Sequence, residues 1–291
     1  MTARNNQDRL GGPSGAVESQ DAPPPVKTET GSDLLSFVLP TEFVELPSRG
    51  EFYPPDHPLH KKDTVEIKFM TARHEDILTS PALLKQGVAV DRLLKELIID
   101  KTIDYDSLLV GDKNALTIGA RTTGYGSEYK INVTCPSCLT VGEHGFDLSK
   151  LKNVFPEEEE LKEFGIERTQ ENTFFITLPT TKVKIEARLL TGKDEKAIEA
   201  HRKMLKKHSG VEPGLTDQLK HIIVSANGET RRHIIEEFVE NMPAMDSKFF
   251  RVCYAAITPN VEMKQDFSCS ACGHEQEVNV PLTAQFFWPG Q

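Results

Sequence analysis

Two Cys-x-x-Cys pairs, far apart along the chain, place the strongest constraint on its fold. The first pair, Cys135 and Cys138, lies in "NVTCPSCLTVGEHGF", and the second, Cys269 and Cys272, lies in "DFSCSACGHEQEV". A two-residue spacer allows a tight turn to direct two thiolates at one metal ion. If both pairs bind a single ion, the fold must bring the middle of the chain and its C-terminal part together.

Four cysteines form a complete tetrahedral ligand set for zinc and leave no position for water or substrate. We therefore predict a structural Zn²⁺ site at Cys135, Cys138, Cys269 and Cys272. Five cysteines and no secretory signal favour a reducing compartment over a disulfide framework. An iron–sulfur cluster, two disulfides or free thiols are the alternatives. Redox catalysis is disfavoured, because each pair follows a strand-like segment and does not begin a helix.

Residues near the cysteines refine this prediction. His144 and His274 follow the two pairs, but four cysteines suffice as ligands, so we expect both histidines to face solvent. Leu139 directly follows the first cysteine pair, whereas Gly273 directly follows the second. This difference raises the question of whether the two turns have the same geometry. Cys253 lies on the apolar face of a predicted helix and is expected to be a small buried hydrophobic residue.

The chain also contains an internal similarity. A shift of 134 residues places Cys135 on Cys269 and Asp112 on Asp246, so that "DKNALTIGARTTGYG" matches "DSKFFRVCYAAITPN". Both segments predict an amphipathic helix, with the aspartate as its N-cap and Gly119 as a close-packing residue in the first helix. Each helix is followed by a strand-like run, "YKINVTC" or "KQDFSC".

A second pair of segments matches at a shift of 120 residues, Val65–Leu78 with Ile185–Ile198. Each predicts a strand, a threonine cap (Thr71 or Thr191) and a helix with acidic residues in its first turn. Just upstream of the second segment, "TFFITLPTTKVKIEA" predicts a hairpin with Pro179 near its turn.

These patterns predict an α+β fold. A strand–helix–helix–strand–CxxC–strand unit would occur twice in tandem, and one shared four-cysteine zinc site would join the copies. The predicted segments are a flexible N-terminal tail (1–33), a first copy with an extended lead-in (34–155), an acidic linker (156–172) and a second copy with an aromatic C-terminal end (173–291).

Charge and missing motifs narrow the possible functions. The formal net charge of −10 disfavours binding to nucleic acid. Phosphate-binding, dinucleotide-binding, nucleophile-elbow and zinc-protease signatures are not found, so we expect no enzyme and assign no catalytic or cofactor-binding residue. No apolar run is long enough for a membrane span. The alternative suggested by the cysteine pairs is a zinc-ribbon protein that binds nucleic acid or acts as a regulator.

Four segments occur in an order that resembles the T4-type bacteriophage baseplate hub proteins, from about residue 38 to the C-terminus. They are "LPSRGEFYP" (Leu46–Pro54), "EIKFMTARHEDIL", "LLVGDKNALTIGARTTGYG" and "VPLTAQFFWPG". The resemblance implies a late protein of a contractile-tailed phage that is a component or an assembly factor of the baseplate hub. Its partners would be other hub or tail proteins, its oligomeric state is left open, and its location would be the host cytoplasm during assembly and the virion tail. The zinc prediction depends on the cysteines alone.

Two aromatic segments outside the repeat have two possible roles. "LPSRGEFYPPDHPLH" precedes the first copy, and Phe286, Phe287 and Trp288 lie near the end of the chain. Exposed aromatic residues would be anchors for a partner, and the alternative is that they pack onto the core.

Overall fold

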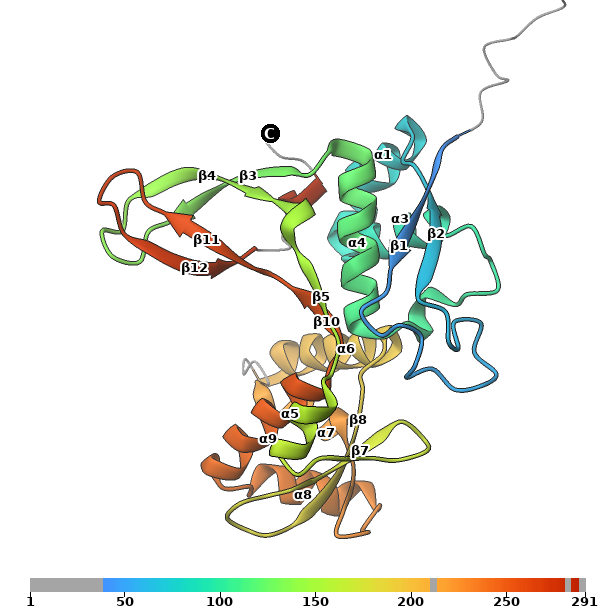
Figure 1. The fold of residues 1–291 in the computed structure, drawn as a ribbon, viewed down its shortest axis with the longest axis vertical. Helices are drawn as coiled ribbons and strands as arrows, with labels where there is room; N and C mark the ends of the chain where they lie inside the picture. Colours follow the sequence, from blue (N-terminus) through green and yellow to red (C-terminus); the bar gives the residue numbers. More distant parts are fainter. Residues whose placement is uncertain (1–38, 210–213, 281–283, 288–291) are drawn as a thin grey trace, which may run out of the picture. The chain divides into compact units, whose positions relative to one another are not determined.

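A computed structural model of the chain describes residues 39–209, 214–280 and 284–287 (Figure 1). The architecture is mixed α+β, as predicted, with helices set between small antiparallel sheets. The predicted tail, residues 1–33, lies outside the described residues. Among the helices described, none combines the length and the apolar character needed to cross a membrane.

The elements follow the chain in two series. The first series contains β1 (Thr41–Glu45), β2 (Thr64–Lys68), α1 (Ala72–Thr79), α2 (Pro81–Gln86), α3 (Ala89–Leu97), α4 (Val110–Tyr125), β3 (Glu128–Thr134), β4 (Val141–Asp147) and β5 (Lys152–Val154). The second contains α5 (Glu158–Glu163), β6 (Glu167–Arg168), β7 (Thr173–Thr177), β8 (Lys184–Arg188), α6 (Gly192–Ser209), α7 (Leu215–Ile222), β9 (Ile223–Ala226), α8 (Arg232–Glu240), α9 (Ala244–Ile257), β10 (Asn260–Glu262), β11 (Lys264–Ser268) and β12 (Glu275–Asn279). Short 3-10 turns lie at Tyr105–Ser107, Leu148–Lys150 and Ala284–Phe287.

Two hairpins, β1·β2 and β7·β8, have the same register. Thr41 lies opposite Lys68 at one end of the first ladder, and Thr173 lies opposite Arg188 at the same end of the second. Each ladder contains five residue pairs. The hairpin predicted around Pro179 is therefore confirmed, and it belongs to a four-stranded sheet of order β6-β7-β8-β9.

The two hairpins differ in the loop between their strands, which spans residues 46–63 in the first and 178–183 in the second. The longer loop contains the whole of the Pro- and aromatic-rich segment noted in the sequence. Its Phe52, Tyr53 and Leu59 side chains are buried in the main hydrophobic core. These aromatic residues therefore stabilise the fold and are not exposed partner anchors.

Threonine caps begin the helices that follow these hairpins, as predicted. The backbone N–H of Thr71 donates to Nδ1 of His74 over 2.9 Å at the start of α1. At the start of α6, the N–H and the hydroxyl of Thr191 both donate to Oδ2 of Asp194 over 2.8 Å. In both cases the third residue after the threonine returns an acceptor to the cap.

Asp112 and Asp246 do not cap their helices, contrary to the prediction. The N-cap residues of α4 and α9 are Leu109 and Pro243, and each aspartate is the third residue of its helix. Both carboxylates are fully buried. Each helix begins three residues earlier than expected, and its aspartate accepts hydrogen bonds from the loop of the preceding hairpin.

Asp112 fixes the long β1·β2 loop to α4. Its carboxylate accepts from the N–H of Ser48 (3.0 Å), from the Ser48 hydroxyl (2.6 Å) and from the Tyr53 hydroxyl (2.6 Å). The Tyr53 oxygen in turn accepts from the N–H of Leu109, the N-cap residue, over 3.0 Å. The loop and the first turn of the helix thus form one buried hydrogen-bond network.

Asp246 has the corresponding role for the short β7·β8 loop and α9. It accepts from the N–H groups of Thr180 (2.7 Å) and Thr181 (2.9 Å) and from the Thr181 hydroxyl (2.7 Å). Buried carboxylates require such donors, because desolvation without them is costly. The two aspartates, 134 positions apart in the sequence, therefore make equivalent contacts.

The pKa values of these two carboxyls move in opposite directions. Burial raises the pKa of Asp112 above its usual value and outweighs its hydrogen bonds. Burial also raises the pKa of Asp246, but the hydrogen bonds from Thr180 and Thr181 outweigh it and hold the pKa below its usual value. The stability that Asp246 contributes is therefore present above its unfolded pKa and is lost as the pH falls through its folded pKa. For Asp112, stability is lost as the pH rises from the unfolded to the folded pKa.

We expect the two Asp→Asn variants to change acid sensitivity in opposite ways. Because an unfolded aspartate has a pKa of about 3.9, Asp246→Asn should reduce the loss of unfolding free energy below about pH 4. Asp112→Asn should reduce the loss of unfolding free energy above about pH 4, because it removes a group whose deprotonation in the folded state costs stability. Urea denaturation at a series of pH values measures both slopes, and parallel curves for the two variants would refute the assignment.

The core faces of α4 and α9 agree with the sequence analysis. A β-carbon on Gly119 would lie 2.6 Å from Cγ2 of Val44, so only glycine allows β1 to pack this closely on α4. Cys253, at the corresponding position of α9, is fully buried. Both predictions for these positions are confirmed.

The aromatic residues near the C-terminus pack onto the core. Phe286 and Phe287 are both 1% exposed, and the Phe286 carbonyl accepts from Nε of the buried Arg121 over 2.8 Å. The alternative that these two side chains fold back is therefore correct. Trp288 lies outside the described residues.

Elements from the two series contact each other directly. Strand β5 pairs with β10, and Leu109 forms a β-bridge with Thr191. The Lys113 ammonium, largely buried, lies 2.6 Å from a carboxylate oxygen of Glu195. These contacts hold together parts of the chain that are distant in sequence.

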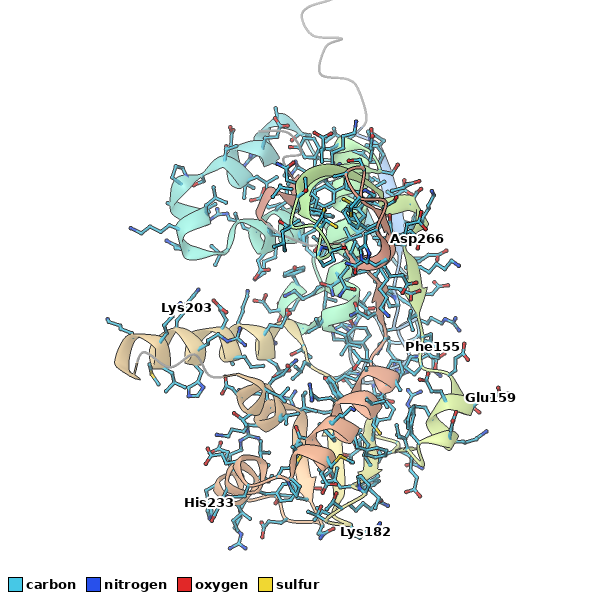
Figure 2. All side chains as sticks on the ribbon, turned by 90° about the vertical axis from the view of Figure 1, so that its left-hand side faces the viewer. Phe155, Glu159, Lys182, Lys203, His233 and Asp266 are labelled. Carbon is cyan, nitrogen blue, oxygen red and sulfur yellow. The ribbon has the colours of Figure 1, made fainter. Side chains whose placement is uncertain are left out.

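The predicted acidic linker, residues 156–172, contains regular structure. It forms α5, which exposes Glu159 (Figure 2), and β6, which pairs with β7. The division of the chain at this segment remains a prediction.

Candidate metal centre

Two hairpins, β3·β4 and β11·β12, carry the cysteine pairs in their turns and lie side by side (Figure 1). The side chain of Gln265 on β11 joins them. It accepts from the N–H of Asp147 over 3.1 Å and donates to the Asp147 carbonyl over 2.6 Å. The sequence analysis missed this residue. The only feature of the sequence that could have indicated this contact is a polar residue at the position in β11 that matches Ile131 in the first hairpin.

The first turn contains Cys135 and Cys138. The N–H of Cys135 donates to the carbonyl of Thr140, and the N–H of Leu139 donates to the carbonyl of Cys135, each over 2.9 Å. Leu139 adopts a positive φ of 61°, which a residue other than glycine rarely does. The turn therefore keeps a conformation that favours glycine although leucine occupies the position.

The second turn has the same hydrogen bonds. The N–H of Cys269 donates to the carbonyl of His274, and the N–H of Gly273 donates to the carbonyl of Cys269, each over 2.9 Å. Gly273 has a φ of 72°, close to that of Leu139. The two turns have equivalent backbone geometry, which answers the question raised by the leucine.

The four sulfur atoms converge between the turns. Sγ of Cys135 lies 3.8 Å from Sγ of Cys272, and Sγ of Cys138 lies 3.8 Å from Sγ of Cys269. All four lie within 4.8 Å of one another. A tetrahedron of sulfurs at the Zn–S distance of about 2.3 Å has edges of about 3.8 Å. The donor set and its spacing therefore fit zinc.

The sulfur spacing also bears on the alternatives. A disulfide requires an S–S distance of about 2.05 Å, and the five cysteines of the chain are free thiols here. Each close pair joins one turn to the other, Cys135 with Cys272 and Cys138 with Cys269. One ion at this position would contact both hairpins.

The thiols perturb one another's ionisation. The hydroxyl and backbone N–H of Thr140 lower the pKa of Cys138 to about 6, and the backbone N–H of Cys272 lowers that of Cys269. The N–H of His274 lowers the pKa of Cys272, but the neighbouring thiols outweigh it and raise the pKa to about 12. Four thiolates this close repel one another, which disfavours full deprotonation. A bound cation would offset this repulsion and favour the thiolate forms.

A small apolar cluster supports the turns. Cys135 and Cys269 are buried with Phe267, whereas Cys138 and Cys272 are exposed. Within the part of the chain that the structure describes, this is the one group of cysteine, histidine or carboxylate side chains found with metal-ligand spacing. Two ligands on the apolar side and two on the solvent side leave an ion only partly shielded from water.

The nearby histidines do not belong to the group. His144 is half-buried, with ring centroids 4.7 Å from Phe146 and 5.0 Å from Phe267. The expectation that it faces solvent is therefore only partly met, because an aromatic ring of each hairpin packs against it. His274 is half-buried beside Gln276, at 3.3 Å from its side-chain oxygen. A four-thiolate site would have no open position, so the chemistry it offers is a cross-link between hairpins.

Comparison with known proteins gives one match. The family model described as T4 bacteriophage base plate protein matches residues 41–288, which is most of the chain. No curated protein and no solved structure matches.

Proposed function

Because the chain belongs to the T4 bacteriophage base plate protein family, we propose that it is a non-enzymatic protein of the central hub of a phage baseplate. It would be a hub component or an assembly factor, made late in infection of a bacterium by a contractile-tailed phage. It would bind other hub or tail proteins in the host cytoplasm and take its place in the virion tail. The family match supports a role in the baseplate. The resemblance of four sequence segments to hub proteins supports a place in its central hub.

The proposal includes a structural zinc ion held by Cys135, Cys138, Cys269 and Cys272. The observation that carries it is the convergence of four free thiols, within 4.8 Å, from two turns of equivalent geometry. When bound, zinc would supply a four-thiolate cross-link and no reactive coordination position. The protein would therefore present surfaces to partners on a fold that the metal keeps rigid.

The proposal also includes a duplicated unit, with copies in residues 34–155 and 173–291 and the segment 156–172 as their linker. It is supported by matched contacts: the hairpin registers, the threonine caps, the buried Asp112 and Asp246, and the cysteine turns. A pseudo-two-fold axis that maps Cys135 onto Cys269 and Cys138 onto Cys272 would also map one close sulfur pair onto the other. The observed pairs, Cys135 with Cys272 and Cys138 with Cys269, have this relation. The metal would then join one copy to the other.

Inactivation of the gene in its phage tests the baseplate role. Cells infected with that phage should make heads and no complete baseplates, and a plasmid copy of the wild-type protein should restore them. Mass spectrometry of purified virions then separates a permanent component from an assembly factor. Complete, infectious tails formed without the protein would refute the proposed function.

A further inference from the structure

Strand β1 has one backbone edge that no described residue covers. The N–H of Leu46 donates to the carbonyl of Asp63 over 2.7 Å, which fixes the alternation of the β1·β2 ladder. The N–H and C=O groups of Thr41 and Phe43 therefore point away from β2. In the structure as described, they make no hydrogen bond on that side.

The corresponding edge in the second half is covered. Phe175 of β7 lies opposite Glu186 of β8, just as Phe43 lies opposite Glu66 of β2. On its other side Phe175 pairs with Glu167 of β6. The same edge therefore has a strand on it in one half and none, among the described residues, in the other.

The turn that brings β6 onto β7 has no counterpart at β1. Asn172, just before β7, has a positive φ of 60° in that turn. Pro40, just before β1, has no such φ and extends the ladder, because its carbonyl accepts from the N–H of Phe69 over 3.0 Å. The chain enters β1 in extended form, and the uncovered edge is suited to a strand from another molecule.

A groove of about 540 Å³ runs beside this edge. Its apolar lining comes from β1, α4, β10, the residue after β2 and the segment that leads from β4 into β5. It includes Val44, Phe69, Ile118, Leu148, Leu151 and Val261. Glu42 and Glu45 are the ionisable side chains among its lining residues. Phe43, at 62% exposure, stands at its rim. An exposed strand edge beside an apolar groove is the arrangement used for strand addition, and the two glutamates favour a basic partner.

We propose that β1 is a docking edge, onto which an extended segment of another baseplate protein adds as a strand. The segment would alternate apolar residues, which enter the groove, with Lys or Arg residues near Glu42 and Glu45. Its backbone would pair with the outward N–H and C=O groups of Phe43. The Glu45 carbonyl already accepts from Nδ2 of Asn153 over 3.3 Å, which limits the docked strand at that end. The identity of the partner as a baseplate protein rests on the proposed function.

Two variants test the docking edge by different means. Phe43→Pro removes an outward N–H and leaves the donors to β2 intact, because proline is tolerated where the N–H of an edge strand faces solvent. The double variant Glu42→Lys and Glu45→Lys reverses the charge of the groove. Leu84→Lys, at an exposed apolar residue of α2, is the matched control. All three proteins should keep the metal content and the unfolding midpoint of the wild type.

The probe is a set of 12-residue peptides that tile the tail proteins encoded by the same phage. Fluorescence anisotropy with the full-length chain should identify a peptide of alternating apolar and basic residues. Both variants should weaken its binding at least tenfold, and Leu84→Lys should leave it unchanged. Hydrogen exchange at the outward N–H groups of Thr41 and Phe43 should be fast in the free chain and slow in the complex.

Several outcomes would overturn the inference. The first is a tiled set in which no peptide depends on Phe43. The second is slow exchange of the Thr41 and Phe43 N–H groups in the dilute free chain, and the third is self-association that Phe43→Pro abolishes. The last two would assign the edge to the chain itself or to a second copy. If the gene is required for baseplates and no peptide binds, the inference fails and the proposed function stands. If peptides bind and baseplates form without the gene, the proposed function fails.

Discussion

Replacement of Cys135 by serine should remove the metal from the purified protein and unfold the paired hairpins β3·β4 and β11·β12. Serine cannot replace the thiolate as a zinc ligand at neutral pH, and three remaining thiolates form an incomplete site. Structural zinc contributes an apparent ~10–16 kcal/mol in isolated zinc-finger peptides. Here most of the main core lies outside these hairpins, so the loss should be concentrated in the hairpins. Metal analysis and hydrogen exchange measure the two effects.

Cys269→Ser is the matched variant, because its turn has the same hydrogen bonds. It should lose the same amount of metal and the same stability, since both substitutions break one shared site. Cys253→Ala is the control: this cysteine is buried away from the cluster, so the variant should be less stable and keep its metal. A Cys135→Ser protein with wild-type metal content would refute the shared site.

Asp112→Ala should lower the free energy of unfolding by about 3–5 kcal/mol, because it leaves the buried donors of Ser48 and Tyr53 without an acceptor. The long β1·β2 loop should lose most of its order, because the Asp112 carboxylate fixes it to α4. Urea denaturation of the metal-loaded protein measures the free energy. Limited proteolysis should show cleavage within residues 46–63 in the variant and none in the wild type.

Asp246→Ala should cost a similar amount, because Thr180 and Thr181 lose an equivalent buried acceptor. Asp76→Ala, at an exposed carboxylate of α1, is the control and should change the free energy by less than about 0.5 kcal/mol. If Asp112→Ala and Asp246→Ala were as mild as the control, the buried networks would not hold the loops.

The parts of the fold that were predicted correctly depend on local patterns. The hairpin around Pro179 follows from alternating side chains and a turn residue, and the caps at Thr71 and Thr191 follow from residues three positions apart. The convergence of the two cysteine pairs followed from coordination chemistry, which requires a full ligand set whatever the sequence separation.

The predictions that were wrong or only partly met concern residues whose contacts come from distant parts of the chain. Aspartate is a common N-cap residue, but the carboxylates of Asp112 and Asp246 accept hydrogen bonds from loop residues instead. Their helices begin about one turn earlier in the sequence. His144 is polar and near a turn, yet one aromatic ring from each hairpin packs against it and leaves it half-buried. Phe286 is buried, and its carbonyl accepts from Arg121, 165 residues away in the sequence. No local pattern specifies these contacts.

X-ray absorption at the zinc edge of the purified protein, with metal analysis on the same sample, tests the central claim most directly. One zinc per chain, with four sulfur neighbours at about 2.3 Å, is the result we predict. Two zinc ions per chain, each with two sulfurs and lighter atoms, would mean that each cysteine turn binds its own ion. That result would contradict a metal cross-link between the two halves of the molecule.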